Sequence, residues 1–204
     1  RENVVVVEAG GAAVFHQLSH AGDGAVVDHL TVQILPDLVQ GLQPVEQLQI
    51  LYLGQIAAEG LVKVLVSADD KKAVAVEVNA ETDFVAKNEK FQNYVAQVAE
   101  QAMDTSATDI EAFLAEPWKF DTSKTVNEAL AGQIAVIGEN MNIRRFYQMT
   151  EENGFVASYT HMGGKIGVLV DVETDVVNDA VREMAKNVAM QCAALNPLYT
   201  SRDL

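Results

Sequence analysis

The chain has 204 residues, a length typical of one or two domains, and apolar residues make up 49% of it, enough for a packed core. Its 14 basic and 29 acidic residues give a formal net charge of −15, which argues against nucleic-acid binding and against docking on an anionic membrane. A single cysteine excludes an internal disulfide, and no apolar run approaches the ~20 residues that span a bilayer. These features favour a cytoplasmic protein.

The first 54 residues differ in composition from the rest. They contain one basic residue, Arg1, against six acids, and no lysine occurs before Lys63. This change predicts a boundary near Gly54. Within the segment the hydrophobic pattern is weak: Val4–Val7 is a candidate strand, and Val45–Leu53 a candidate short helix.

Three of the four histidines also lie in this first segment. His16 and His20 are four residues apart and would share one face of a helix, with His29 as a third ligand for a metal. Neither a firm helical pattern nor a nearby acidic partner supports that site. We therefore assign no metal site and keep a histidine-dependent metalloenzyme only as an alternative class.

From residue 61 onward the hydrophobic periods are regular. Strands are predicted at Leu61–Ser67 and Ala73–Asn79, with a face of alternating valines in the second strand and Glu77 on the opposite face. A helix is then predicted to begin near Asn88, because Phe91 and the apolar residues after it recur at helical spacing. The remaining predicted elements are a helix capped by Thr125 and Glu128, strands at Met141–Met149, Phe155–His161 and Ile166–Glu173, and a helix over Val176–Leu195.

A strand, a Glu-Thr-Asp turn and a helix occur twice, around Glu81-Thr82-Asp83 and around Glu173-Thr174-Asp175. Two copies predict an α+β protein with two related subdomains, each a small antiparallel sheet covered by helices. The first copy is followed by a further helix and strand, Thr125–Met149, whereas the second is followed only by Thr200–Leu204. We therefore expect an atypical segment over residues 1–54, a first subdomain over 55–150 and an incomplete, truncated second subdomain over 151–204. Apolar surface left open on the latter would favour an oligomer.

Signatures of covalent catalysis are weak in this sequence. Gly164-Lys165 is not a phosphate-binding loop, because Tyr159 and Ile166 stand where the first glycine and the hydroxyl residue belong. Cys192 lies on the apolar face of its helix and is expected to be buried. The turn Thr82-Asp83-Phe84-Val85 is different, since a strand-to-helix turn presents side chains from a rigid frame. Taken alone, however, Asp83 and Phe84 would be read as a helix-start charge and a core residue.

The residues around this turn resemble the signature of bacterial-type elongation factor Ts, and other segments agree with that family in the same order. The resemblance covers about residues 55–204. The matching segments are Asn79-Ala80-Glu81-Thr82-Asp83-Phe84-Val85-Ala86-Lys87-Asn88, Ile137-Gly138-Glu139-Asn140, Ser158-Tyr159-Thr160-His161 and Gly163-Gly164-Lys165-Ile166-Gly167-Val168.

The resemblance implies a guanine-nucleotide exchange factor that binds elongation factor Tu and promotes GDP release, with no cofactor and no covalent chemistry of its own. It also implies that the turn Thr82–Val85 contacts Tu, with Asp83 and Phe84 as a wedge against the G domain. Ile137 and His161 resemble two further contact residues. The setting is then the cytoplasm or, for an organelle member of the family, the matrix.

Residues 1–54 do not resemble the helical N-terminal module of that family, which makes its own contact with Tu. Their lack of lysine and of periodicity suggests a foreign or mistranslated leader. The alternative function is therefore a weakened or inactive fragment of elongation factor Ts that binds Tu without efficient exchange.

Overall fold

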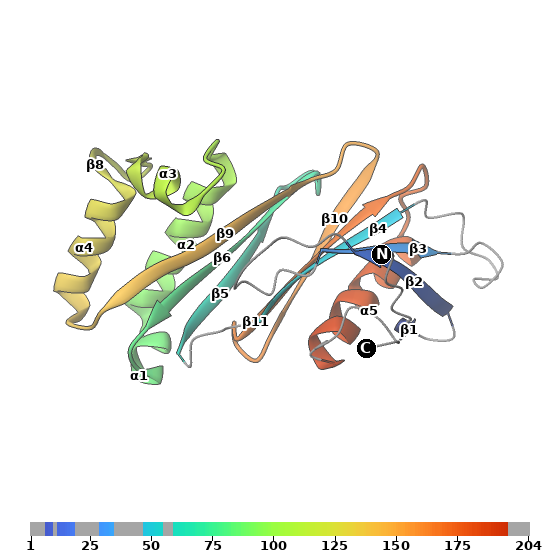
Figure 1. Ribbon diagram of the computed structural model, residues 1–204, viewed down its shortest axis with the longest axis horizontal. Helices are drawn as coiled ribbons and strands as arrows, with labels where there is room; N and C mark the ends of the chain where they lie inside the picture. The colour runs from blue at the N-terminus through green and yellow to red at the C-terminus, as the bar shows by residue number, and fades with distance from the viewer. Residues whose placement is uncertain (1–6, 10–11, 19–28, 35–46, 55–58, 196–204) are drawn as a thin grey trace.

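The computed structural model describes residues 7–9, 12–18, 29–34, 47–54 and 59–195 (Figure 1). It contains both strands and helices, and every strand pair that it describes is antiparallel. The strands are β1 Val7–Ala9, β2 Ala12–Leu18, β3 His29–Ile34, β4 Gln47–Gly54, β5 Gly60–Val66, β6 Lys72–Ala80, β7 Pro117–Trp118, β8 Asp121–Thr125, β9 Met141–Thr150, β10 Gly154–His161 and β11 Ile166–Glu173. The helices are α1 Asp83–Ala86, α2 Glu89–Asp104, α3 Ile110–Ala115, α4 Val126–Ile137 and α5 Asp179–Leu195.

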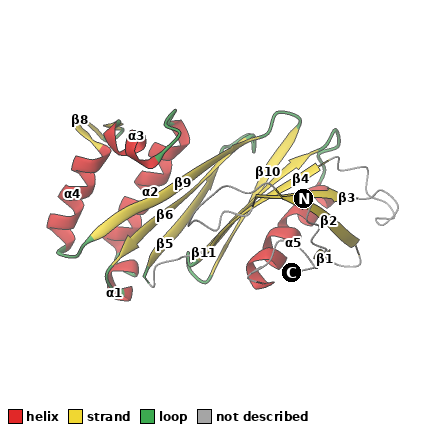
Figure 2. Ribbon diagram, viewed as in Figure 1, coloured by secondary structure: helices red, strands yellow, loops and turns green. Residues whose placement is uncertain are grey.

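The first unit, residues 59–150, is a three-stranded sheet in the order β5-β6-β9 with helices α2, α3 and α4 on one face (Figure 2). The predicted alternation in β6 is confirmed, since Val74, Val76 and Val78 face the core under these helices. Both predicted helix starts are confirmed as well. The side chain of Asn88 accepts a hydrogen bond from Lys90 N, and Thr125 with Glu128 forms a capping box.

The second unit is built on β10, β11 and α5. Its sheet has the order β1-β2-β3-β4-β11-β10, and α5 packs on it through a core that includes Phe155, Val170 and Val188. Cys192 is buried in that core, as predicted. The helix begins at Asp179 rather than Val176. The side chain of Asn178 caps it by accepting a hydrogen bond from Val181 N, whereas Val176 N donates to the Thr174 hydroxyl before the helix starts.

The two sheets pack face to face. Val62, Ala73 and Ala75 of the first unit meet Val156 and Leu169 of the second in a shared core. The molecule is therefore layered as helices, sheet, sheet and helix (Figure 1). This arrangement confirms the predicted α+β class of antiparallel sheets covered by helices.

One prediction for the first 54 residues is wrong. Val45–Leu53 is not a helix, because Gln47–Gly54 forms β4 and pairs along its length with β11. Only Gln47–Ile50 alternates between polar and apolar residues, and Ile50–Leu53 is a continuous apolar run, which fits a buried strand as well as a helix. His16 lies in strand β2, Ala12–Leu18, and not in a helix.

The rest of that first segment is described in part. His20 lies outside the described residues, and of the predicted strand Val4–Val7 only Val7 lies within them, in β1. In the larger sheet, β4 pairs with β11 on the side away from β10. In the first sheet, β9 takes the corresponding position, because it pairs with β6 on the side away from β5. The larger sheet therefore includes strands from both sides of the composition change near residue 54.

Candidate functional site

The turn between β6 and α2 contains the short helix α1. Thr82 precedes it with an extended backbone, and its hydroxyl accepts a hydrogen bond from Val85 N at 3.4 Å. Successive helical residues point in directions about 100° apart, so one short helix presents different faces to core and solvent. Val85 and Ala86 enter the core of the first unit, whereas Phe84 is 81% exposed. The core interpretation of Phe84 is therefore excluded.

The turn after α4 is tied to this Phe84 turn. The Thr82 hydroxyl donates to the Glu139 carboxylate, with distances of 2.8 and 3.0 Å to its two oxygens. Gly138 ends α4 in the left-handed conformation with φ at 82°, and this reversal turns Glu139 toward Thr82. Ile137 is half-buried against the first core, while its neighbour Val136 is 63% exposed. The contact joins two predicted site segments that are far apart in the sequence.

The third predicted segment is the end of β10. The Tyr159 hydroxyl lies 3.2 Å from His161 Nδ1, which holds the imidazole beside the phenol ring. The turn that follows is fastened to the first unit, because Val62 N donates to Gly164 O at 2.7 Å. His161 is therefore presented on a connection anchored to both sheets.

Two ion pairs complete this part of the surface. Lys87 Nζ lies 2.7 Å from the Asp83 carboxylate, and Lys165 Nζ lies 3.1 Å from Glu59. The hydrogen bond from Lys87, with the positive charges of Lys87 and Lys165, holds the pKa of Asp83 below its usual value. The same hydrogen bond raises the pKa of Lys87. Lys165 of the second unit thus lies within electrostatic range of the α1 turn.

These three turns lie along one edge of the molecule, the lower edge in Figure 1. We name this surface the turn edge and define it by Phe84, Val136, Ile137, His161 and Met162. Its three most exposed apolar side chains are Phe84 in α1, Val136 near the end of α4 and Met162 in the β10–β11 turn.

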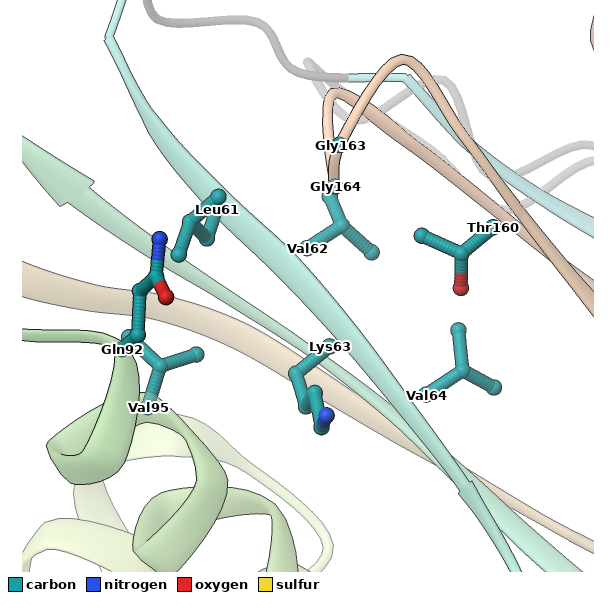
Figure 3. Close-up of a pocket in the computed structure, with 9 residues that line it drawn as sticks. All are labelled: Leu61, Val62, Lys63, Val64, Gln92, Val95, Thr160, Gly163 and Gly164. Atoms are coloured by element: carbon teal, nitrogen blue, oxygen red, sulfur yellow. The ribbon is translucent and has the colours of Figure 1, made fainter. Parts of the chain in front are cut away.

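A pocket of about 310 Å³ opens beside β5, between α2 and the β10–β11 turn (Figure 3). Leu61, Gln92 and Val95 lie on one side of the strand, and Thr160 with Gly164 on the other. Its full lining is Leu61, Val62, Lys63, Val64, Gln92, Val95, Thr160, Gly163 and Gly164. No carboxylate, imidazole or thiol is among these residues, and Lys63 is the one acid–base side chain in the lining.

Among the residues that the structure describes, no three His, Cys, Asp or Glu side chains gather into a group that could hold a metal ion. In the same residues, no helix is both long and apolar enough to cross a bilayer. What the turn edge does offer is exposed apolar side chains on short, well-anchored turns, which suits recognition of another protein.

The structure places Thr82, Asp83, Phe84, Ile137 and His161 on or beside the turn edge. Val85 is the exception, since its side chain lies in the first core. Sequence reasoning did not single out Glu139, Met162 or Lys165. Motif segments containing Glu139 and Lys165 had been noted, but no sequence signal pairs Glu139 with Thr82 across 57 positions.

Comparison with known proteins gives one family. The profile described as "Elongation factor TS" matches residues 81–204. A protein named elongation factor Ts from Halothermothrix orenii is 51% identical over 150 residues, which are 74% of this chain and 50% of that protein. The elongation factor Ts from Clostridium botulinum (strain Eklund 17B) is also 51% identical, over 74% of this chain. The elongation factor Ts from Clostridium tetani is 48% identical over 73% of this chain. In both cases the match covers 49% of the relative's own length. The chain thus spans about half the length of the curated relatives it matches.

Proposed function

Since the chain belongs to the elongation factor Ts family, we propose that it binds elongation factor Tu and promotes the release of GDP from Tu during translation elongation. The observation that carries this proposal is Phe84, a large aromatic side chain that is 81% exposed on a turn fixed to the core by its neighbours. In this role the chain works by binding, not by making or breaking covalent bonds, and its setting is the cytoplasm.

The geometry of the α1 turn supports a wedge. Phe84 stands out from a helix of four residues whose next two side chains are buried. Thr82 is held by Glu139, so the base of the wedge is braced from a second element. An aromatic anchor that is already ordered loses little conformational entropy when it is buried in a partner.

The thermodynamics of exchange follow from linkage. If this chain lowers the affinity of Tu for GDP, GDP must lower the affinity of Tu for this chain by the same free energy. Nucleotide on such GTPases is held by a phosphate loop and by a magnesium ion that bridges the phosphates. A wedge that displaces the elements framing that site weakens both contacts and accelerates GDP release.

The remaining residues of the turn edge have supporting roles in this proposal. Asp83 carries a negative charge at neutral pH, as a solvent-accessible aspartate ordinarily does, and can accept hydrogen bonds from the partner. Ile137 and His161 extend the contact to the turns on either side of α1. Thr82 and Val85 hold the turn in place.

A second candidate function is binding without efficient exchange. It is favoured by the length of the match, since the chain spans about half of each relative. Binding energy from the part of the relatives that this match does not span would then be needed to displace the nucleotide site.

The proposal is tested by measuring the affinity of the chain for Tu·GDP with wild type and Phe84→Ala. We expect the change to cost about 2 kcal/mol or more of binding free energy, roughly thirtyfold in Kd, with the fold unchanged. Phe120→Ala is the matched control, because Phe120 is also an exposed phenylalanine but lies in the β7–β8 hairpin at the far end of the first unit from α1 (Figure 1). Equal affinities for wild type and Phe84→Ala would contradict the proposal.

A further inference from the structure

Met162 combines two features that are unfavourable for a folded chain. Its side chain is 69% exposed, second only to Phe84 among the large exposed apolar residues that the structure describes. Its backbone is in the left-handed region with φ at 51°, a conformation in which a side chain with a β-carbon meets steric repulsion. Glycine would remove both costs at this position. An exposed, backbone-strained methionine therefore indicates a role outside the stability of the fold.

The strained turn is held rigidly. Gly163 and Gly164 follow Met162 with φ at 65° and 97°, so three successive residues are left-handed. Gly164 N and Lys165 N both donate to His161 O at 3.2 Å, and Gly164 O accepts from Val62 N. A β-carbon on Gly164 would lie 2.9 Å from Leu61 Cδ2, so the turn is pressed closely against β5. Met162 is thus presented to solvent from a fixed base.

The turn that carries Met162 lies within electrostatic range of the Phe84 turn. Lys165, three residues after it, pairs with Glu59 and adds to the positive field at Asp83. The turns that carry Met162 and Phe84 both lie on the turn edge (Figure 1). The two residues come from different units, one from each of the two packed sheets.

We propose that Met162 is a second apolar anchor for elongation factor Tu, entering an apolar depression on the surface of Tu next to the one that receives Phe84. This inference rests on the proposed function and extends it to a residue that neither the motif nor the family match singles out. A methionine suits such a contact, because its unbranched, polarisable side chain adapts to an irregular apolar surface.

Anchors on two units make binding depend on how the sheets are packed. The shared core of Val62, Ala75 and Leu169 fixes the separation of the two turns. A partner that receives both side chains therefore gains the full contact only from a molecule in which the sheets keep this packing. Each anchor alone contributes less, and the two contributions are coupled.

Met162→Gly separates a binding role from a structural one, because a binding role predicts that affinity for Tu falls while the free energy of unfolding does not. Glycine adopts the left-handed conformation without strain, so we expect the free energy of unfolding to stay the same or rise. Affinity for Tu·GDP should fall at least tenfold. Met162→Asn, which tolerates the same backbone but is polar, should weaken binding as well, whereas Met162→Leu should restore most of it.

Met190→Ala is the matched control, since Met190 is also an exposed methionine but lies on α5, which carries none of the three turns. Its affinity for Tu·GDP should equal that of wild type. The inference is overturned if Met162→Gly binds as tightly as wild type while Phe84→Ala binds weakly, a result that leaves the proposed function standing. It is also overturned if Met162→Gly unfolds more easily in proportion to its loss of affinity. Wild-type chain that does not bind Tu at all would refute both the proposed function and this inference.

Discussion

The two units begin their helices from the same Glu-Thr-Asp sequence and reach different structures. In the first, five residues separate Thr82 from the helix cap Asn88, and they form α1 with Phe84 turned outward. In the second, only three residues separate Thr174 from the cap Asn178, and no helical turn forms between them. Thr174 is buried and binds the backbone of Val176, whereas Thr82 reaches the Glu139 carboxylate.

The difference indicates that the α1 turn is an addition to the repeat, one that the sheet and helix of the repeat do not need in order to fold. Two extra residues give the first connection room for a helical turn. That turn directs the Phe84 side chain into solvent and the next side chain, Val85, into the core. The second connection follows the shorter route and supports only the sheet and helix. Function is therefore expected to be lost by changes at α1 that leave the repeat itself intact.

Aligning the two units on their threonines and cap asparagines pairs the core positions and gives a set of tests. Leu169 in β11 corresponds to Glu77 in β6, Asp171 to Asn79, and Met184 in α5 to Tyr94 in α2. In each pair one residue is more polar or more readily charged than the other. Exchanging them shows which side chains are needed by the fold and which are tolerated by it.

The largest effect is expected at Glu77. Its carboxylate is fully buried and accepts a hydrogen bond of 2.6 Å from Arg145 Nε on the neighbouring strand. Arg145→Met removes the cation and leaves a buried charge, so we expect the free energy of unfolding to fall by about 3–5 kcal/mol in urea titrations.

The double change Glu77→Leu with Arg145→Met copies the apolar character of Leu169 at the corresponding place. It should restore the free energy of unfolding to the wild-type value or above, because no charge then needs a partner. A double variant as unstable as the single one would show that the first sheet requires the ion pair for its packing.

The next effect concerns Asp171 and depends on pH. Burial, together with a hydrogen bond to Glu151 and the charges of Glu151 and Glu173, raises the pKa of Asp171 to about 8. Between the ordinary carboxyl pKa near 3.8 and this value, the folded protein keeps a proton that the unfolded chain has lost. Stability should therefore fall as the pH rises from about 4 to 8, and Asp171→Asn should flatten that decline.

Urea unfolding at pH 5, 6.5 and 8 measures this dependence. The reciprocal change Asn79→Asp in the first unit serves as the control, since it should introduce a similar decline with pH. An Asp171→Asn protein whose stability still fell with the wild-type slope would show that another group is responsible.

The smallest effect is expected at Tyr94. Among the described residues its buried hydroxyl has no hydrogen-bond partner, and burial raises the pKa of the phenol. The corresponding Met184 shows that the repeat does not need a hydroxyl here. Tyr94→Phe should raise the free energy of unfolding by up to about 1 kcal/mol. A clear loss of stability would mean that the hydroxyl contributes a favourable interaction.

Periodicity and caps were enough to predict most of the described elements after residue 60. The alternating valines of β6, the Asn88 cap and the Thr125–Glu128 capping box are local signals, and local signals are readable from sequence. The strand at Gln47–Gly54 was missed because its conformation is decided by pairing with β11, more than a hundred residues away. The four-residue α1 was too short to produce a period of its own.

The candidate site was predictable only in part for the same reason. The family-like segments identified Phe84, Ile137 and His161, but residue type alone favoured a buried Phe84. The contact between Thr82 and Glu139 depends on how α4 ends relative to α1, which is a property of the folded unit. The exposure of Met162 likewise follows from the hydrogen bonds that fix its turn against β5.

The most direct test of the central claim is the rate at which a fluorescent GDP analogue leaves purified Tu in the presence of this chain. We predict that wild type accelerates release and that Phe84→Ala, folded as judged by its circular dichroism spectrum, loses most of the acceleration. Phe120→Ala should accelerate release as wild type does. Wild-type chain that binds Tu but leaves the release rate unchanged, or a fully active Phe84→Ala, would contradict the claim that the α1 turn is an exchange wedge.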